Sequence, residues 1–211
     1  MRVDATPLGW HPMSMDPDAR VALLRRGLRL EYATLAWNVV GIVITLAAAV
    51  AARSVALAGF ALDSGVEIFA SLVVVGQLAG TTSEAGQEQA ERRIGYAFLA
   101  LAVYLTGQGI VTLAAKLHPY SSPVGIGWLA ATAAAMFALA YGKFVTGRAL
   151  DHRVLKAEAK VTVVDGALAT ATLIGLILNA AAGWWWADVA AGAVIVGYGL
   201  REGVHLLRAS S

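Results

Sequence analysis

Two carboxylates stand inside an otherwise apolar stretch, where charged side chains are costly. Asp63 and Glu67 lie in the segment ALDSGVEIFAS. Four residues turn a helix through about 400°, so both side chains share one face, one turn apart. An Asp at the centre of a bilayer costs about 2.5–3.5 kcal/mol on insertion scales, and neighbouring carboxylates repel each other. A cation or a proton between them would relieve both penalties, which predicts a cation site.

A second pair of carboxylates occupies a later apolar stretch. Glu158 and Asp165 are seven residues apart, about 20° short of two helical turns, so they share a face. Thr162 lies between them, and Val161 borders the same face. Lys160 is about 200° from Glu158 and therefore points away. We expect its amine to extend to the membrane interface; the alternative is a counter-ion that moves during transport.

Two other roles for these four carboxylates stay open. They could form buried hydrogen bonds that hold helices together, or a proton pathway that carries no metal. Asn38 and Gln108, in two further apolar stretches, suit interhelical hydrogen bonds or accessory positions at the cation site. Asp188 is expected to cap the N-terminus of the last helix. The four histidines are expected at the surface, in tails or loops: His11, His118, His152 and His205.

The composition is typical of a membrane protein. Of 211 residues, 58% are hydrophobic and 14% are charged, and the mean hydropathy is +0.67. A soluble domain carries about 25% charged residues, and about 20 apolar residues span a bilayer. Six stretches are long enough: 28–52, 54–80, 94–117, 123–145, a fifth ending near 182, and 184–207. We therefore predict an all-α polytopic membrane protein with six transmembrane helices at 20–208, a flexible cytoplasmic tail at 1–19 and a short tail at 209–211.

Several function classes are disfavoured by what the sequence lacks. Cysteine is absent, so neither a disulfide framework nor a cysteine metal site can form. The sequence contains no H-E-x-x-H, G-x-S-x-G or phosphate-binding loop, and no enzyme activity is expected. The net charge is +2, but its basic residues stand between apolar stretches. The expected partner is therefore the lipid bilayer and not nucleic acid.

Lysine and arginine predict how the chain is oriented. Thirteen of the 16 fall in the N-terminal tail and the alternate segments that follow it, Lys143 among them. The opposite side holds Arg53 and Lys116, and Lys160 lies within or near a span. The positive-inside rule then places both termini in the cytoplasm, for a multi-pass protein of the cell (inner) membrane. Trp184 and the two tryptophans after it would belong to the outer aromatic belt.

The spacing of the acids resembles that of the cation diffusion facilitator (cation efflux) family. The second helix of that family carries D-x-x-x-D or H-x-x-x-D, and here DSGVE stands at 63–67, followed by the small residue Ser71. Its fifth helix carries A-D-x-x-H-x-x-x-D, and here AEAKVTVVD stands at 157–165. Asp165 matches the final Asp and Glu158 the earlier acid, whereas Val161 replaces the usual His. The stretch GWWWADVAAGAVIVG also resembles the sixth helix of members of this family.

The resemblance implies a divalent transition-metal exporter of the Zn/Cd type, working by metal/proton antiport with alternating access. It implies Asp63, Glu67 and Asp165 as metal ligands, with Glu158 as a fourth ligand or a proton carrier. Without the His, an all-oxygen site suits Mn²⁺ or Fe²⁺. The C-terminal cytoplasmic domain of the family is not expected here, so a homodimer would form through transmembrane helices. The alternatives are a non-transporting metal-binding membrane scaffold and a proton-coupled organic-cation carrier. No cofactor is expected beyond the transported metal.

Overall fold

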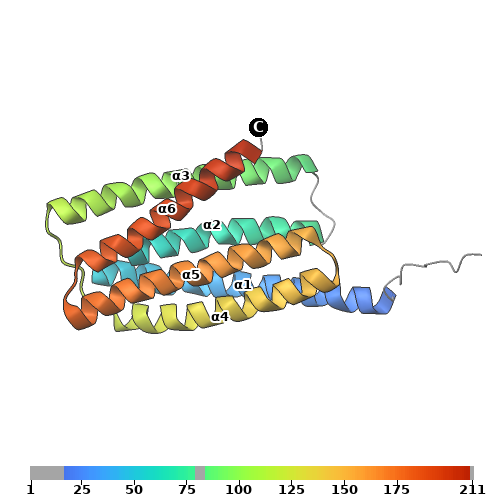
Figure 1. Cartoon of the computed structure of the whole chain (residues 1–211), viewed down its shortest axis with the longest axis horizontal. Helices are drawn as coiled ribbons and strands as arrows, with labels where there is room; N and C mark the ends of the chain where they lie inside the picture. The colour runs from blue at the N-terminus through green and yellow to red at the C-terminus, as the bar shows by residue number, and fades with distance from the viewer. Residues whose placement is uncertain (1–16, 79–83, 210–211) are drawn as a thin grey trace, which may run out of the picture.

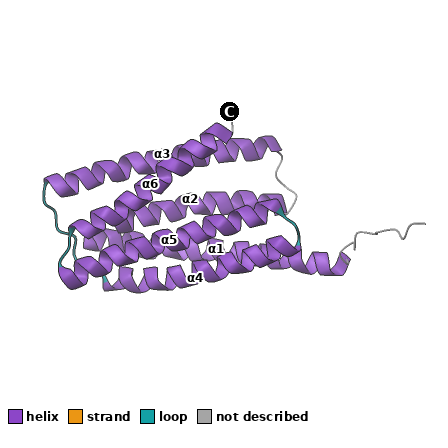
Figure 2. Ribbon diagram, viewed as in Figure 1, coloured by secondary structure: helices purple, strands orange, loops and turns teal. Residues whose placement is uncertain are grey.

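The computed structural model describes residues 17–78 and 84–209, and within them every regular element is a helix (Figures 1 and 2). The helices are α1 (Pro17–Ala52), α2 (Val55–Leu78), α3 (Glu84–Ala114), α4 (Pro123–Ala149), α5 (Arg153–Ala182) and α6 (Trp186–Ala209). The all-α prediction is therefore confirmed. α1 begins at Pro17, inside the segment expected to be a tail, and the rest of that segment (1–16) lies outside the described residues.

The helix ends follow from local chemistry. Ser122 caps α4, since its Oγ accepts the Gly125 N–H at 3.1 Å, and Pro123 then starts the helix. α5 ends at Ala182, and the C-cap Gly183 has a φ of 67°, the left-handed conformation typical of that position. These signals set the connections that turn the chain back at each end of the bundle.

Successive helices run in opposite directions along one bundle (Figure 1). α1, α2, α4 and α5 pack together, while α3 pairs chiefly with α6 along the side of that group. The start of α1 and the end of α6 lie toward the same end of the bundle, at the right of Figure 1. α2 and α5 are in contact, so the two helices that carry the predicted carboxylates meet.

The surface of the bundle is apolar and its interior is partly polar. Val50 is 74% exposed and Val103 is 73% exposed, whereas Glu31 and Thr45 are fully buried. In the described residues, four segments are long and apolar enough to cross a membrane: Pro17–Ala52, Gly95–Ala114, Pro123–Ala149 and Leu155–Ala182. Apolar residues facing outward, with polar residues inside, indicate a membrane protein.

The G-x-x-x-G pattern of α6 allows close packing against α3. A Cβ on Gly203 would lie 2.9 Å from the Gly95 carbonyl oxygen and 3.0 Å from the Leu99 side chain. A Cβ on Gly199 would lie 3.4 Å from the Phe98 carbonyl oxygen. The small residues therefore let two backbones approach within this chain, as such patterns do in membranes.

Gly203→Ala is expected to destabilise the α3–α6 pair by about 1–3 kcal/mol, because the added methyl group meets backbone atoms. Gly197→Ala is the matched control in the same helix, since a Cβ there would meet no atom of the described residues within 4 Å. Thermal unfolding in detergent micelles would measure both. Equal melting temperatures for the two variants would contradict the close approach seen at Gly203.

His152 is half-buried and caps α5, although the sequence predicted a surface residue. Its Nδ1 accepts the Leu155 N–H at 3.3 Å, which only a neutral imidazole can do. Burial first, and then the positive charge of Arg20, holds the pKa of His152 below its usual 6.5. The folded protein therefore binds fewer protons here than the unfolded chain. The stability from this cap is present above pH 6.5 and is lost as the pH falls below that value.

We expect acidification from about pH 7.5 to about pH 5.5 to lower the melting temperature through the loss of this cap. His152→Asn supplies a capping side chain that does not titrate. Melting temperatures of both proteins across this pH range would be compared, so that the titration of other groups cancels. If the melting temperatures of the two proteins changed equally with pH, His152 would not be the source of a pH-dependent stability.

Candidate cation site

One face of α2 presents polar side chains to the bundle interior. Asp63 and Glu67 are each 5% exposed, and Ser71 is fully buried one turn further on. Spacing of four residues places all three along one stripe. The structure thus places the acids predicted in this stretch on a shared, buried face.

The facing stripe comes from α5. Glu158 and Asp165 are 4% and 3% exposed, and Thr162 between them is fully buried. Lys160, on the same helix, is exposed. The helical geometry predicted from the sequence is therefore what the structure shows: the acids point inward and the lysine points outward.

The two stripes meet at Glu67 and Asp165. The negative charges of Glu67 and Asp165 act on each other across the contact between α2 and α5. In the part of the chain that the structure describes, both oxygens of Asp165 and Oε1 of Glu67 have no hydrogen-bond partner. Negative charges on Asp63 and Glu67 would repel each other, as would those on Asp63 and Asp165. A proton or a cation between buried carboxylates would relieve this repulsion and supply the missing partner.

The three acids nearest this point do not form a ready-made set of metal ligands. Among the described residues, no group of three or more His, Cys, Asp or Glu side chains lies close enough to hold a metal ion.

Of the two accessory amides, one joins the site and one does not. Asn38 of α1 is 2% exposed, and its Nδ2 donates to Glu67 Oε2 at 2.9 Å. Gln108 of α3 is exposed and does not face the bundle interior. The Asn38 amide orients the Glu67 carboxylate and leaves its other oxygen free to accept a cation.

A buried lysine stands beside these acids, and its burial was not predicted from the sequence. Lys143 of α4 was counted among the cytoplasmic topology signals, but it is fully buried. Its Nζ donates to Glu31 Oε2 at 3.0 Å, to Thr162 Oγ1 at 3.1 Å and to Glu158 Oε1 at 3.4 Å. Ser71 Oγ also donates to Glu158 Oε1, at 3.2 Å. Glu158 is thus held by a salt bridge and a hydroxyl group.

Glu31 and Lys143 could have been suspected from the sequence, because each is a charge within or beside an apolar stretch. Their pairing, however, could not be predicted from the sequence, because 112 positions separate them. Charges that lie in spans generally pair with one another. The buried polar group therefore comprises five carboxylates and one ammonium: Glu31, Asp63, Glu67, Glu158, Asp165 and Lys143.

Asp188 lies in the first turn of α6, but it caps a different helix from the one predicted. Its Oδ2 accepts the Val55 N–H at 2.9 Å and the Ala56 N–H at 3.3 Å, at the N-terminus of α2. Its Oδ1 accepts the Ser54 hydroxyl. The prediction that Asp188 caps its own helix is therefore wrong. Its carboxylate ties the start of α6 to the start of the helix that carries Asp63 and Glu67.

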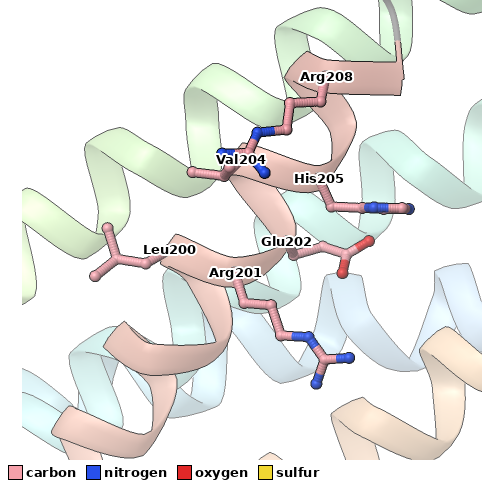
Figure 3. Close-up of a pocket in the computed structure, with 6 residues that line it drawn as sticks. All are labelled: Leu200, Arg201, Glu202, Val204, His205 and Arg208. Carbon is pink, nitrogen blue, oxygen red and sulfur yellow. The ribbon is translucent and has the colours of Figure 1, made fainter.

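An open pocket lies along the C-terminal half of α6, toward the end of the bundle where α1 begins (Figures 1 and 3). Glu202 and His205 project from the same side of the helix into this region (Figure 3). The remaining described lining residues are Leu200, Arg201, Val204 and Arg208. Both signs of charge are present here, so the pocket favours no one class of ion.

The other histidines do not reach the buried acids. His118 and His205 are exposed, and the His118 ring lies 5.1 Å from that of Trp185; His11 lies outside the described residues. The candidate site in the described residues is therefore built from oxygen ligands. No family model matches this chain, and no curated protein matches it either.

Proposed function

We propose that this protein exports a divalent transition-metal cation across the cell (inner) membrane, by metal/proton antiport with alternating access. The observation that carries the proposal is the pair Glu67 and Asp165: two buried carboxyl groups on contacting helices, with three oxygens that have no hydrogen-bond partner in the described part of the chain. Such a pair can hold a cation or a proton. The resemblance of the two acid motifs to cation diffusion facilitators supports the same function.

In the proposed mechanism, Asp63, Glu67 and Asp165 bind the metal. Carboxylates must lose their protons to become ligands, so protons and metal compete for the same oxygens. Asn38 keeps Glu67 oriented while either one is bound. A pH difference across the membrane would then drive metal release on the more acidic side. Among metals, the family resemblance favours Zn²⁺ or Cd²⁺, while the all-oxygen ligand set suits Mn²⁺ or Fe²⁺.

The proposal includes six spans with both termini in the cytoplasm. α2 and α6 have 24 residues each, or about 36 Å of helix, enough to cross the bilayer core. Successive helices run in opposite directions (Figure 1). Removing Lys143 from the topology count still leaves twelve basic residues against two. The exposed amide of Gln108, on an otherwise apolar face of α3, is where we would look for a homodimer contact.

The test is flux into liposomes that carry the purified protein and a pH step. Zn²⁺, Cd²⁺, Mn²⁺ and Fe²⁺ would be followed in turn with an internal dye. We expect at least one metal to follow the pH step, and Asp63→Asn to reduce its flux to the level of empty liposomes. Glu202→Gln makes the same chemical change on α6, outside the buried group, and should retain transport. Folded protein that moves none of the metals would contradict the proposal.

A second candidate, a proton-coupled carrier of small organic cations, is favoured by one observation. The buried group already holds an alkylammonium, that of Lys143, between two carboxylates. A substrate amine could bind in the same manner. This carrier would show pH-driven amine flux without any divalent metal. If neither metal nor amine moves but metal still binds, the chain acts as a metal-binding membrane scaffold.

A further inference from the structure

The ammonium of Lys143 uses all of its hydrogen-bonding capacity inside the bundle. Its three donors match three acceptors, which come from Glu31 of α1 and from Glu158 and Thr162 of α5. Thr162 can accept because its own hydroxyl donates to the Glu158 carbonyl at 3.0 Å. Lys143 therefore joins α4 to two other helices at once.

The two carboxylates are not equivalent partners of this lysine. Glu31 is fully buried and lies at 3.0 Å from Nζ, and among the described residues no other donor to its carboxylate is seen. Glu158 is at 3.4 Å and is shared with the Ser71 hydroxyl. Glu31 is thus the closer and more dependent partner. The ammonium can therefore break its contact with Glu158 and still be neutralised by Glu31.

Glu158 also lies next to the proposed cation site. It shares a buried face of α5 with Asp165, about 10 Å further along the helix. Its bound hydroxyl, Ser71, lies one turn from Glu67 on α2. The charges of Glu158 and Lys143 both act on Glu67. A cation at Glu158 would therefore lie between the N-terminal end of α5 and the Glu67–Asp165 pair.

We propose that Lys143 is a tethered competitor of the transported cation: it neutralises Glu158 when no cation is there, and yields it to a cation that passes, while Glu31 retains the ammonium. This inference rests on the proposed function. Lys143 acts through Glu158 and does not touch the substrate. By competing for Glu158, it prevents this carboxylate from acting as a tightly bound fourth ligand. Cations are then released from the site and not trapped in it.

The proposal predicts that removing Lys143 increases the affinity for the cation, which the loss of a purely structural lysine would not do. Without the competing ammonium, Glu158 is free to bind the cation, so affinity rises and release slows. If Lys143 merely held helices together, its loss would loosen the site and weaken binding. The variant to use is Lys143→Gln with Glu31→Gln, because it removes one positive and one negative charge together and leaves the net charge of the buried group unchanged.

The experiment measures Zn²⁺ and Mn²⁺ binding to the full chain in detergent by titration calorimetry, and flux in liposomes. We expect the double variant to bind about tenfold more tightly, and its flux at saturating metal to fall by a similar factor. Adding Glu158→Gln should return the affinity to the wild-type range. Lys143→Arg keeps the charge and should stay close to wild type in both measurements. Size-exclusion profiles and melting temperatures would confirm that each variant is folded.

Two outcomes distinguish a failure of this inference from a failure of the proposed metal-export function. Wild-type protein that binds metal, with a folded double variant that binds equally or more weakly, would overturn the role of Lys143 and leave the transporter proposal standing. Folded wild-type protein that binds neither metal in detergent and moves none of the four metals in liposomes would overturn both.

Discussion

Replacing Lys143 alone with methionine is expected to lower the free energy of unfolding by about 3–5 kcal/mol, because removing one partner of a buried ion pair leaves the other uncompensated. Here two carboxylates would lose their counter-charge, Glu31 at 3.0 Å and Glu158 at 3.4 Å. Both sit where water does not reach them. Methionine preserves most of the side-chain volume, so the loss would report charge and not packing. Thermal unfolding in detergent micelles is the measurement.

The chain supplies a matched control for this prediction. Lys156 makes a salt bridge to Asp151 at 2.8 Å, shorter than either pair of Lys143, but the Asp151 side chain is 93% exposed. Exposed pairs contribute about 0–1 kcal/mol, so Lys156→Met should change the melting temperature little. Adding Glu31→Gln to Lys143→Met should recover part of the lost stability. Equal melting temperatures for Lys143→Met and Lys156→Met would show that the buried pair contributes no more than a surface pair.

The helices were largely predictable because local sequence features, such as apolar stretches and prolines, determine where they begin and end. Apolar stretches at 28–52 and 123–145 correspond to α1 and α4, and Pro123 begins α4 as expected. The errors lie where a helix continues without apolar residues. α1 starts eleven residues before the stretch at 28–52, because its arginine-rich first turns form helix as readily as its apolar part. Hydropathy identifies only the apolar part of a helix, whereas α1 continues beyond its apolar part.

The site was predictable within one helix but not between helices. Helical periodicity placed Glu158 and Asp165 on a common face, and the structure agrees. Periodicity does not say which face of another helix lies opposite. For that reason Lys143, 15 residues from Glu158 and 112 from Glu31, could be counted as a surface charge. The pairing depends on how α1, α4 and α5 pack, and only the packed structure contains it.

Asp188→Ala is expected to destabilise the protein by about 2–4 kcal/mol, because it leaves buried donors at the N-terminus of α2 without an acceptor. The lost partners are the Val55 and Ala56 N–H groups and the Ser54 hydroxyl. The carboxylate also opposes the positive end of the α2 dipole, which the alanine cannot do. Hydrogen exchange should therefore accelerate first in the opening turn of α2, and a lower melting temperature should accompany it.

Asp188→Asn separates the two contributions, since the amide keeps one acceptor oxygen but carries no charge. It should fall between wild type and Asp188→Ala in melting temperature. If α6 used Asp188 to cap itself, the exchange would instead accelerate at the start of α6, with the first turn of α2 unchanged. Because α2 carries Asp63 and Glu67, loosening its first turn should also weaken metal binding without any change at the site itself. Asp188 thus connects the stability of one helix end to the position of the carboxylates about two and three turns further along.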